Sequence, residues 1–269
     1  MATISKEHDK NTDLTRFALA YVVDKRVYSN GDTTIVSFGR SRLTNKKVIV
    51  KCLQATEYQK LREANILKKL INVPGVITFL DRYYFTSTKQ IMVTEYFGDC
   101  NLARFIHRYA PVSENTTHKI ITQLVNAAQA CYNLHILHRK IRPSNILINT
   151  KTLQVKLHNF DTACSFDDDF FDAPLWPNIA PPEYLTTKTY TADGHYVWTI
   201  GLILYELLFN SKPFESTESI ITKSCLASTR KPIDINALVL VGWMLNKNPL
   251  QRIHLWEIPN HPWITRKWI

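Results

Sequence analysis

The chain has 269 residues, 45% of them hydrophobic, which is enough to bury a full core in one large domain or two packed lobes. It carries 33 Lys and Arg against 23 Asp and Glu, a formal net charge of +10, which favours acidic partners without by itself indicating nucleic-acid binding. No apolar run reaches the roughly 18 residues of a bilayer span, and the first residues lack a secretory signal. We therefore expect no membrane contact and a location in the cytoplasm or nucleus.

Cysteine and glycine usage narrows the chemistry further. The five cysteines are widely spaced and form no CxxC pair, so we expect free thiols. Glycine is scarce, at 7 residues in the whole chain, whereas an average protein has about 7%. A glycine-rich phosphate-binding loop of the usual kind is therefore not expected.

The first third of the chain has the pattern of a sheet with one inserted helix. Short β-prone runs separated by turn signals occupy residues 17–53 and predict an antiparallel meander. Apolar residues at helical spacing over 56–70 predict a helix, which Pro74 and the glycine after it end. Two further strands are predicted, around 76–84 and 90–96.

The rest of the chain is predicted to be mostly helical. A long helical stretch over 101–134 is interrupted near Ala110 and the proline that follows it. The pattern predicts an α+β fold made of an N-terminal tail (1–14), a small β-rich lobe with one key helix (15–97) and a larger α-helical lobe (98–269).

Several ordered segments carry the strongest signal. A strand ends at Lys51, and Glu63 follows on the predicted helix. Then come, in order, LHRKIRPSNILI, VKLHNFD, APPEYL, VWTIGLILYELL and NPLQRIHLWEIPNHPW. Over nearly its whole length the chain resembles a eukaryotic protein kinase with a bilobal fold, and the segments PPEYL and NHPW are most similar to the PIM family of serine/threonine kinases.

The resemblance implies a nucleotide site at five positions. Lys51 stands where the family's strand lysine contacts nucleotide phosphates, and Glu63 stands where a helix glutamate holds that lysine. Asn145 matches the catalytic-loop asparagine that binds a second magnesium ion, and Thr94 and Glu95 complete the set. A purely structural reading stays open, in which the lysine and glutamate only tie strand to helix and the asparagine only caps a turn.

Two positions depart from the family in a way that bears on catalysis. The catalytic aspartate, which accepts the proton of the substrate hydroxyl, falls on Lys140, a cation without a free lone pair. The magnesium-binding aspartate falls on Asn159, whose amide brings no charge to a hard cation. Asp161, two residues on, lies about 6 to 7 Å along an extended segment and is too far to replace it. The sequence therefore predicts no metal site.

The phosphate loop of the family is also altered. The three family glycines fall on Tyr28, Asn30 and Thr33, whose side chains are expected to crowd phosphates rather than cradle them. Arg142 stands in place of the catalytic-loop lysine. We expect no cofactor, and at most weak, metal-independent ATP binding.

Other matching positions indicate architecture. His138 and Phe160 are expected to stack in the core, and Glu183 with Arg252 to form an ion pair within the larger lobe. The aspartate that anchors the catalytic loop in the family is replaced within residues 196–198, so its support is expected to differ.

An acidic stretch follows in the segment that kinases use for activation. Its carboxylates could pair with a basic cluster on the catalytic loop, or be simply solvated. The acids are Asp167, Asp168, Asp169 and Asp172, and the basic residues are Arg139, Lys140 and Arg142.

Because base, metal ligand and glycine loop are replaced together, the sequence predicts a PIM-like pseudokinase and not an enzyme. It would act by binding protein partners, either kinases or their substrates, as a regulator, decoy or scaffold. Two alternatives stay open. One is an atypical active serine/threonine kinase with relocated catalytic residues, and the other is a basic nucleic-acid-binding protein on a kinase scaffold.

Overall fold

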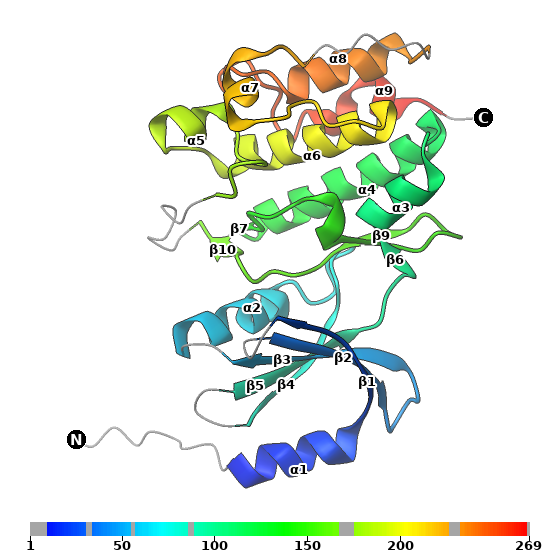
Figure 1. Ribbon diagram of the computed structural model, residues 1–269, viewed down its shortest axis with the longest axis vertical. Coiled ribbons are helices and arrows are strands. Elements are labelled where there is room, and N and C mark those ends of the chain that lie inside the picture. Colours follow the sequence, from blue (N-terminus) through cyan, green and yellow to red (C-terminus); the bar gives the residue numbers. More distant parts are fainter. Residues whose placement is uncertain are drawn as a thin grey trace. The chain divides into compact units, whose positions relative to one another are not determined.

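The computed structural model describes residues 10–30, 34–54, 57–85, 89–166, 175–225 and 232–267, with the side chains of 10–12, 25–30 and 57–61 left out. The chain divides into two compact units, and each is considered by itself. The first unit holds Met1–Ile71 and Ile77–Tyr96, and the second holds Asn72–Val76 and Phe97–Ile269. The first is rich in strands and the second is mainly helical, so the α+β class predicted from the sequence is confirmed (Figure 1).

The first unit is a five-stranded antiparallel sheet with a helix on each face. The strand order is β1-β2-β3-β5-β4, which leaves β1 and β4 at the edges. In chain order the elements are α1 (Lys10–Ala20), β1 (Tyr21–Asn30), β2 (Thr34–Ser41), β3 (Lys47–Gln54), α2 (Glu57–Lys69), β4 (Phe79–Tyr84) and β5 (Lys89–Glu95).

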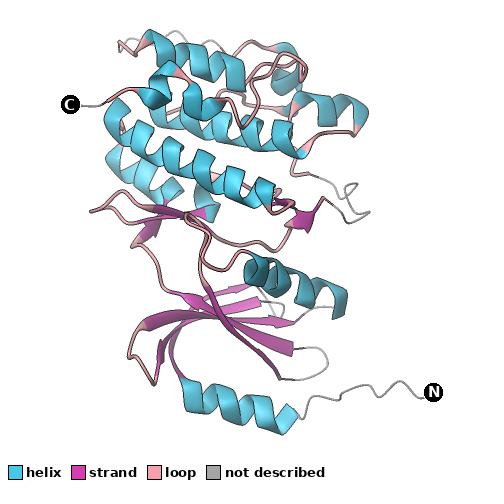
Figure 2. Cartoon of the chain, turned by 180° about the vertical axis from the view of Figure 1, so that it is seen from behind, coloured by secondary structure: helices cyan, strands magenta, loops and turns pink. Residues whose placement is uncertain are grey.

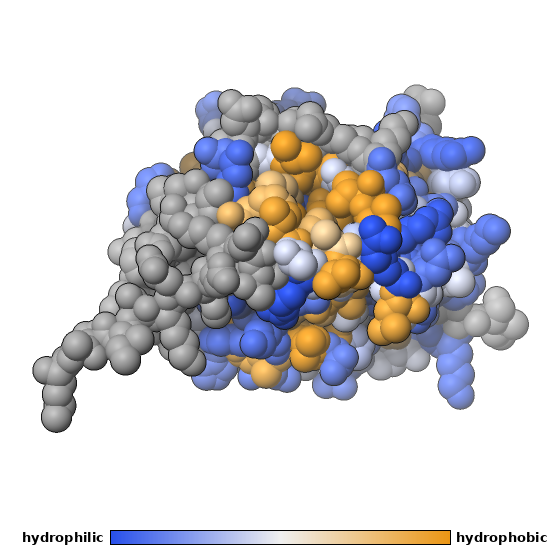
Figure 3. Space-filling model, turned by 90° about the horizontal axis from the view of Figure 1, so that it is seen from below, coloured by the Kyte–Doolittle hydropathy of each residue, from blue (hydrophilic) through white to orange (hydrophobic). Residues whose placement is uncertain are grey.

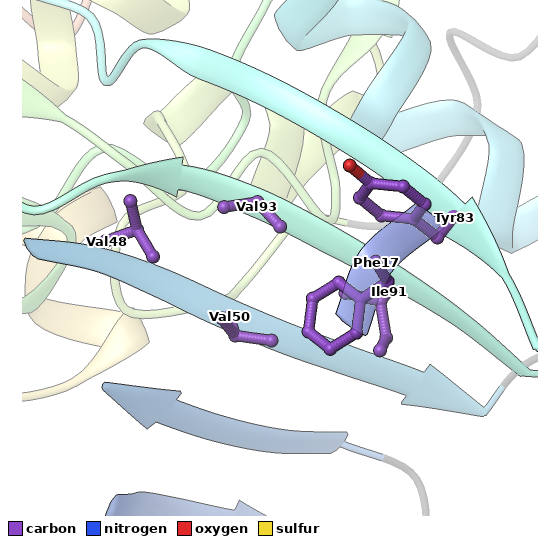
Figure 4. Packing of buried hydrophobic residues seen from close by; sticks show 6 residues of the cluster. All are labelled: Phe17, Val48, Val50, Tyr83, Ile91 and Val93. Atoms are coloured by element: carbon purple, nitrogen blue, oxygen red, sulfur yellow. The ribbon is translucent and has the colours of Figure 1, made fainter. Parts of the chain in front are cut away.

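Alternation along β3 decides what each face of the sheet contacts. Val48 and Val50 point to one face and are buried. Lys51 points to the other face, where it pairs with Glu63 of α2. The buried cluster on the first face also takes in Phe17 of α1, Tyr83, Ile91 and Val93 (Figure 4). Helix α1 therefore closes the face of the sheet opposite α2.

Helix α1 is an element that the sequence pattern misplaced. The apolar run beginning at Phe17 was expected to be a strand, whereas the helix continues to Ala20 and the strand begins at Tyr21. The ring of Phe17 packs edge-on against Tyr83 at 5.3 Å, which requires a helical turn before the sheet. Alanine and leucine favour that turn.

The second unit is built around two long helices and three short pairs of strands (Figure 2). The expected break near Ala110 is present, between α3 and α4. The elements are β6 (Cys100–Asn101), α3 (Leu102–Tyr109), α4 (Glu114–Asn133), β7 (Ile136–Leu137), η1 (Pro143–Asn145), β8 (Ile146–Ile148), β9 (Val155–Leu157), β10 (Cys164–Ser165), α5 (Pro182–Thr187), α6 (Ala192–Phe209), α7 (Thr217–Thr222), α8 (Ile235–Met244), η2 (Ile258–Asn260) and α9 (Pro262–Thr265).

Helix α6 is the centre of this unit, because nearly all its side chains are buried, including Tyr196 and Trp198. It passes close to α8 at Gly201, where an added Cβ would lie 2.9 Å from the Cβ of Met244. Glycine is therefore required there for the helices to pack at this distance.

The cysteines are all free thiols, as expected. Cys131 and Cys164 are buried in the second unit, and Cys52, Cys100 and Cys225 are half-buried. Among the helices formed by the described residues, none combines the length and the apolar character that a membrane span requires.

Candidate catalytic site

The pair of Lys51 and Glu63 is formed. The Nζ of Lys51 lies 2.7 Å from Oε2 of Glu63, and the two side chains are 14% and 4% exposed. A desolvated pair of this kind is held more firmly than a surface ion pair. It ties β3 to α2, so the structural reading of the pair is realised, and a nucleotide role would use the same ammonium group.

Thr94 and Glu95, at the end of β5, are used within the first unit. Thr94 is buried and pairs with Ile49 and Phe79. Oε1 of Glu95 accepts hydrogen bonds from the backbone N of Thr78 at 2.8 Å and from its hydroxyl at 2.6 Å. The carboxylate of Glu95 therefore holds the start of β4 in place.

Asn145 closes the catalytic loop on itself. Its Nδ2 donates to the backbone oxygen of Lys140 at 2.9 Å, and its own backbone N donates to the oxygen of Arg142 at 2.8 Å. The residue is buried. The turn-capping reading of Asn145 is thus seen directly, and the loop from Lys140 to Asn145 is held as one turn.

Lys140 is the most altered residue of the loop, and its ammonium has two neighbours. Its Nζ lies 3.2 Å from Oδ2 of Asp161 and 4.9 Å from the ring centre of Trp176. The guanidinium of Arg142 lies 5.8 Å from the same ring. A carboxylate is therefore present next to residue 140, although it comes from position 161 and not from the loop.

The backbone at Arg139 and Asn159 is left-handed, with φ of 60° and 63°. Asparagine tolerates this region better than most residues, so the replacement at Asn159 keeps the turn. The Nε of Arg139 donates to the oxygen of Thr162 at 2.6 Å. This bond ties the catalytic loop to the segment that follows Asn159.

His138 and Phe160 form the core contact that the sequence predicted. Their ring centres are 4.3 Å apart and both are fully buried. The Nδ1 of His138 accepts from the backbone N of Lys140, so its Nε2 carries the proton and donates to the oxygen of His158 at 3.0 Å. Burial lowers the pKa of His138 to about 4.

Tyr196 supports the catalytic loop, and sequence reasoning missed this. Its hydroxyl donates to the oxygen of Ile136 at 2.8 Å and accepts from the backbone N of His138 at 3.2 Å. Burial raises the pKa of Tyr196 well above its ordinary value, so the group is neutral. The expected loss of support is therefore wrong, because a phenol on α6 contacts the loop backbone on both sides of Leu137.

Other predicted positions fall partly outside the described residues. Tyr28 and Asn30 lie on β1, where their backbones pair with Val36 and Thr34, but their side chains are not described. Thr33 lies outside the described residues, and so do the four activation-segment acids, Asp167, Asp168, Asp169 and Asp172. Their contact with the catalytic loop stays a prediction.

The ion pair of Glu183 and Arg252 is confirmed. Two nitrogens of the guanidinium donate to the two carboxylate oxygens at 2.7 and 2.8 Å. The Arg252 side chain is 1% exposed, so this bidentate pair is buried architecture within the second unit.

A cavity of about 490 Å³ adjoins the catalytic loop within the second unit. Its floor is apolar and includes Ile203 and Phe214, and its wall includes Arg142, Ser144 and Glu206. Burial raises the pKa of the Glu206 carboxyl, and Lys212 opposes the shift. A carboxyl group in such a setting favours a ligand that brings a cation or a hydrogen-bond donor.

The described residues do not fit a resident magnesium ion. The catalytic loop and the segment after it offer the amides of Asn145 and Asn159, while Asp161 is already paired with Lys140. Within the described part of the chain, no three His, Cys, Asp or Glu side chains converge on a metal-binding point. Magnesium prefers carboxylate oxygens, so the donor set is poor for it.

These features match one class of protein. The strand lysine with its helix glutamate, the catalytic loop, the core pair and the buried Glu183–Arg252 bridge all occur in family order. A family model described as a protein kinase domain matches residues 23–264, so the chain belongs to the protein kinase family.

The relatives are named serine/threonine kinases. The human SNF-related serine/threonine-protein kinase is 26% identical over 93% of this chain and 34% of its own length. Protein kinase domain-containing protein ppk9 of Schizosaccharomyces pombe is 30% identical over 88% of this chain and 46% of its own. Serine/threonine-protein kinase pim-2 of Danio rerio is 29% identical over 71% and 61%. The chain thus spans less than two thirds of each of these relatives.

The matches contradict one prediction made from the sequence. The replacements at Lys140 and Asn159 led to the expectation that the chain is not an enzyme. The kinase family model and relatives named as serine/threonine kinases point instead to an enzyme. The error was to count replaced residues one by one, without knowing which side chains the fold brings to the same place.

Proposed function

We propose that the chain is an atypical, PIM-like serine/threonine protein kinase in which Asp161 supplies the carboxylate that the catalytic loop lacks. The observation that carries this proposal is the 3.2 Å contact between Oδ2 of Asp161 and Nζ of Lys140. The Asp161 side chain is 40% exposed, so it is open to a substrate. A carboxylate at residue 140 in the family and one beside residue 140 here serve the same proton.

The chemistry follows from the groups at this point. The oxygen of a substrate Ser or Thr hydroxyl attacks the terminal phosphorus of a nucleoside triphosphate, and the bond to the bridging oxygen breaks. Asp161 orients the hydroxyl and accepts its proton. Lys140 and Arg142, as fixed cations, stabilise the negative charge on the phosphoryl oxygens, which in this family is a matter of positioning and electrostatics.

Nucleotide is bound by Lys51, held by Glu63, with Asn145 on the catalytic loop. Because the described donor set does not fit magnesium, we propose that affinity for nucleotide is low and does not rise with the metal. No metal step is part of the mechanism.

The acceptor is a protein. The cavity beside Arg142 combines an apolar floor with the Glu206 carboxyl, which suits a basic side chain of a substrate segment. We propose kinases or substrates of kinases as partners, and no nucleic acid. The work takes place in the cytoplasm or nucleus, where free thiols persist.

The test is transfer of radiolabelled terminal phosphate from ATP to a basic serine peptide, with magnesium and with manganese. We expect slow transfer that Lys51→Ala abolishes and Asp161→Asn lowers by about 100-fold or more. Asp24→Asn removes an exposed carboxylate elsewhere and is the matched control, with no change expected. Transfer that survives Asp161→Asn, or no transfer above a mock purification, would refute the proposal.

A further inference from the structure

Helix α1 presents two different faces. Its inner face carries Asp13, whose Oδ2 accepts from the backbone N of Tyr84 at 3.0 Å, and Phe17, which is buried. Its outer face carries Leu14, Ala18 and Leu19, at the spacing of one helical stripe. Leu19 is 71% exposed. A polar outer face would be usual for a helix that only covers a sheet, so this apolar stripe needs a different explanation.

The stripe continues beyond the helix. The turn after β2 is fixed to the end of α1, because Arg42 donates from its backbone N to Ala20 and from Nε to Ala18, both at 2.8 Å. Leu43, next in the chain, is 93% exposed. Val23 follows on β1, on the same face as Tyr21, which stacks on Phe17. We call Leu14, Ala18, Leu19, Val23 and Leu43 the outer apolar surface.

The charge around this surface has one sign. In the described segments 13–24 and 41–47, one acid is exposed, Asp24. Four basic side chains are exposed in the same segments, namely Arg16, Arg42, Lys46 and Lys47. Figure 3 views the molecule from the side of α1 and shows hydrophobic groups gathered among hydrophilic ones. An apolar stripe bordered by cations is complementary to an apolar stripe bordered by acids.

We propose that the outer apolar surface binds an amphipathic helix of a partner protein, with acidic residues beside its apolar stripe. Ala18, in the middle of the stripe, has a small side chain and lets a partner helix approach closely, while Leu14 and Leu19 flank it. A second copy of this chain is a poor occupant, because two such surfaces would bring two sets of cations together. The surface lies in the first unit, and its function does not depend on phosphoryl transfer.

The probe is a fluorescent synthetic peptide of about five helical turns, roughly 18 residues, with leucine at helical spacing and glutamate beside it. A second peptide keeps the leucines and has lysine in place of each glutamate. We expect the glutamate peptide to bind the full chain in an anisotropy titration about tenfold or more tightly than the lysine peptide. Raising the salt concentration should weaken its binding.

Variants locate the site. Leu14→Asp with Leu19→Asp should abolish binding, while Leu250→Asp, at a leucine 92% exposed in the second unit, should leave it unchanged. These residues are exposed, so circular dichroism melting should be nearly the same for all three proteins. Arg16→Glu with Lys46→Glu should weaken binding of the glutamate peptide and improve that of the lysine peptide.

Four results would overturn the proposal. They are equal binding of both peptides, no binding of either, a dimer in sedimentation that Leu19→Asp dissolves, and co-sedimentation with vesicles of phosphatidylserine and phosphatidylcholine that the same variant abolishes. The last two would assign the surface to a second copy or to a membrane.

Discussion

A single phenol takes over a task that relatives of this chain assign to a carboxylate. The hydroxyl of Tyr196 contacts the oxygen of Ile136 and the backbone N of His138. Replacing Tyr196 by Phe removes both contacts and leaves buried backbone groups without a partner. We expect the free energy of unfolding to fall by about 1–3 kcal/mol in urea titrations. Tyr109→Phe, at an exposed tyrosine on α3, is the control, and an equal loss in both variants would speak against a brace.

His138 predicts a dependence of stability on pH. Burial lowers its pKa in the folded chain to about 4, below the ordinary value of 6.5. The unfolded chain therefore binds the proton more readily, and folding stability is lost as the pH falls from about 6.5 towards 4. The contribution approaches about 3 kcal/mol at the acid end. In His138→Gln the free energy of unfolding should vary less with pH over this window, and an unchanged slope would contradict the assignment.

Two glycines on neighbouring helices give opposite predictions. On α6, a Cβ at Gly201 would lie 2.9 Å from side-chain atoms of Met244 and Leu245, so Gly201→Ala forces α6 and α8 apart. We expect a loss of about 1–3 kcal/mol. On α8, Gly242 has nothing within 4 Å, so Gly242→Ala should stabilise the helix by about 0.5–1 kcal/mol. Urea unfolding of both variants checks the pair, and the same sign in both would refute the packing argument.

At the scale of the element, the sequence pattern was sufficient where periodicity was clear and insufficient where it was ambiguous. The helix at 57–69 and the break before α4 were predicted because apolar spacing and Pro111 leave little choice. The run at Phe17 suits a strand or a buried helix equally well. Only the ring of Phe17 against Tyr83 decides between them, and that contact joins residues 66 positions apart.

At the scale of the whole molecule, the order of the kinase motifs was enough to predict the fold class and the family. The proposed site was less accessible to sequence reasoning. The carboxylate beside residue 140 comes from Asp161, because Nζ of Lys140 reaches it across a turn. An estimate along an extended chain excluded Asp161 as a replacement for the family's metal ligand, but it could not show this contact with Lys140.

Nucleotide binding can be followed on the whole protein. At about 100 times its dissociation constant a ligand stabilises the folded state by about 2.7 kcal/mol. We expect ATP to raise the melting temperature by the same amount with magnesium as with a chelator, because the described donors do not fit the metal. Lys51→Ala should remove the rise, while Lys47→Ala, at an exposed lysine on the same strand, should not. A rise that needs magnesium would contradict the proposed site.

The free thiols give each unit its own chemical reporter. Cys131 lies fully buried on α4, and burial raises its pKa to about 12, so it reacts only when the second unit opens. Cys52 lies half-buried on β3 in the first unit, where burial also raises its pKa. The alkylation rates of these two cysteines, followed by mass spectrometry, would therefore time the breathing of the two halves separately, in the unmodified protein and without an added label.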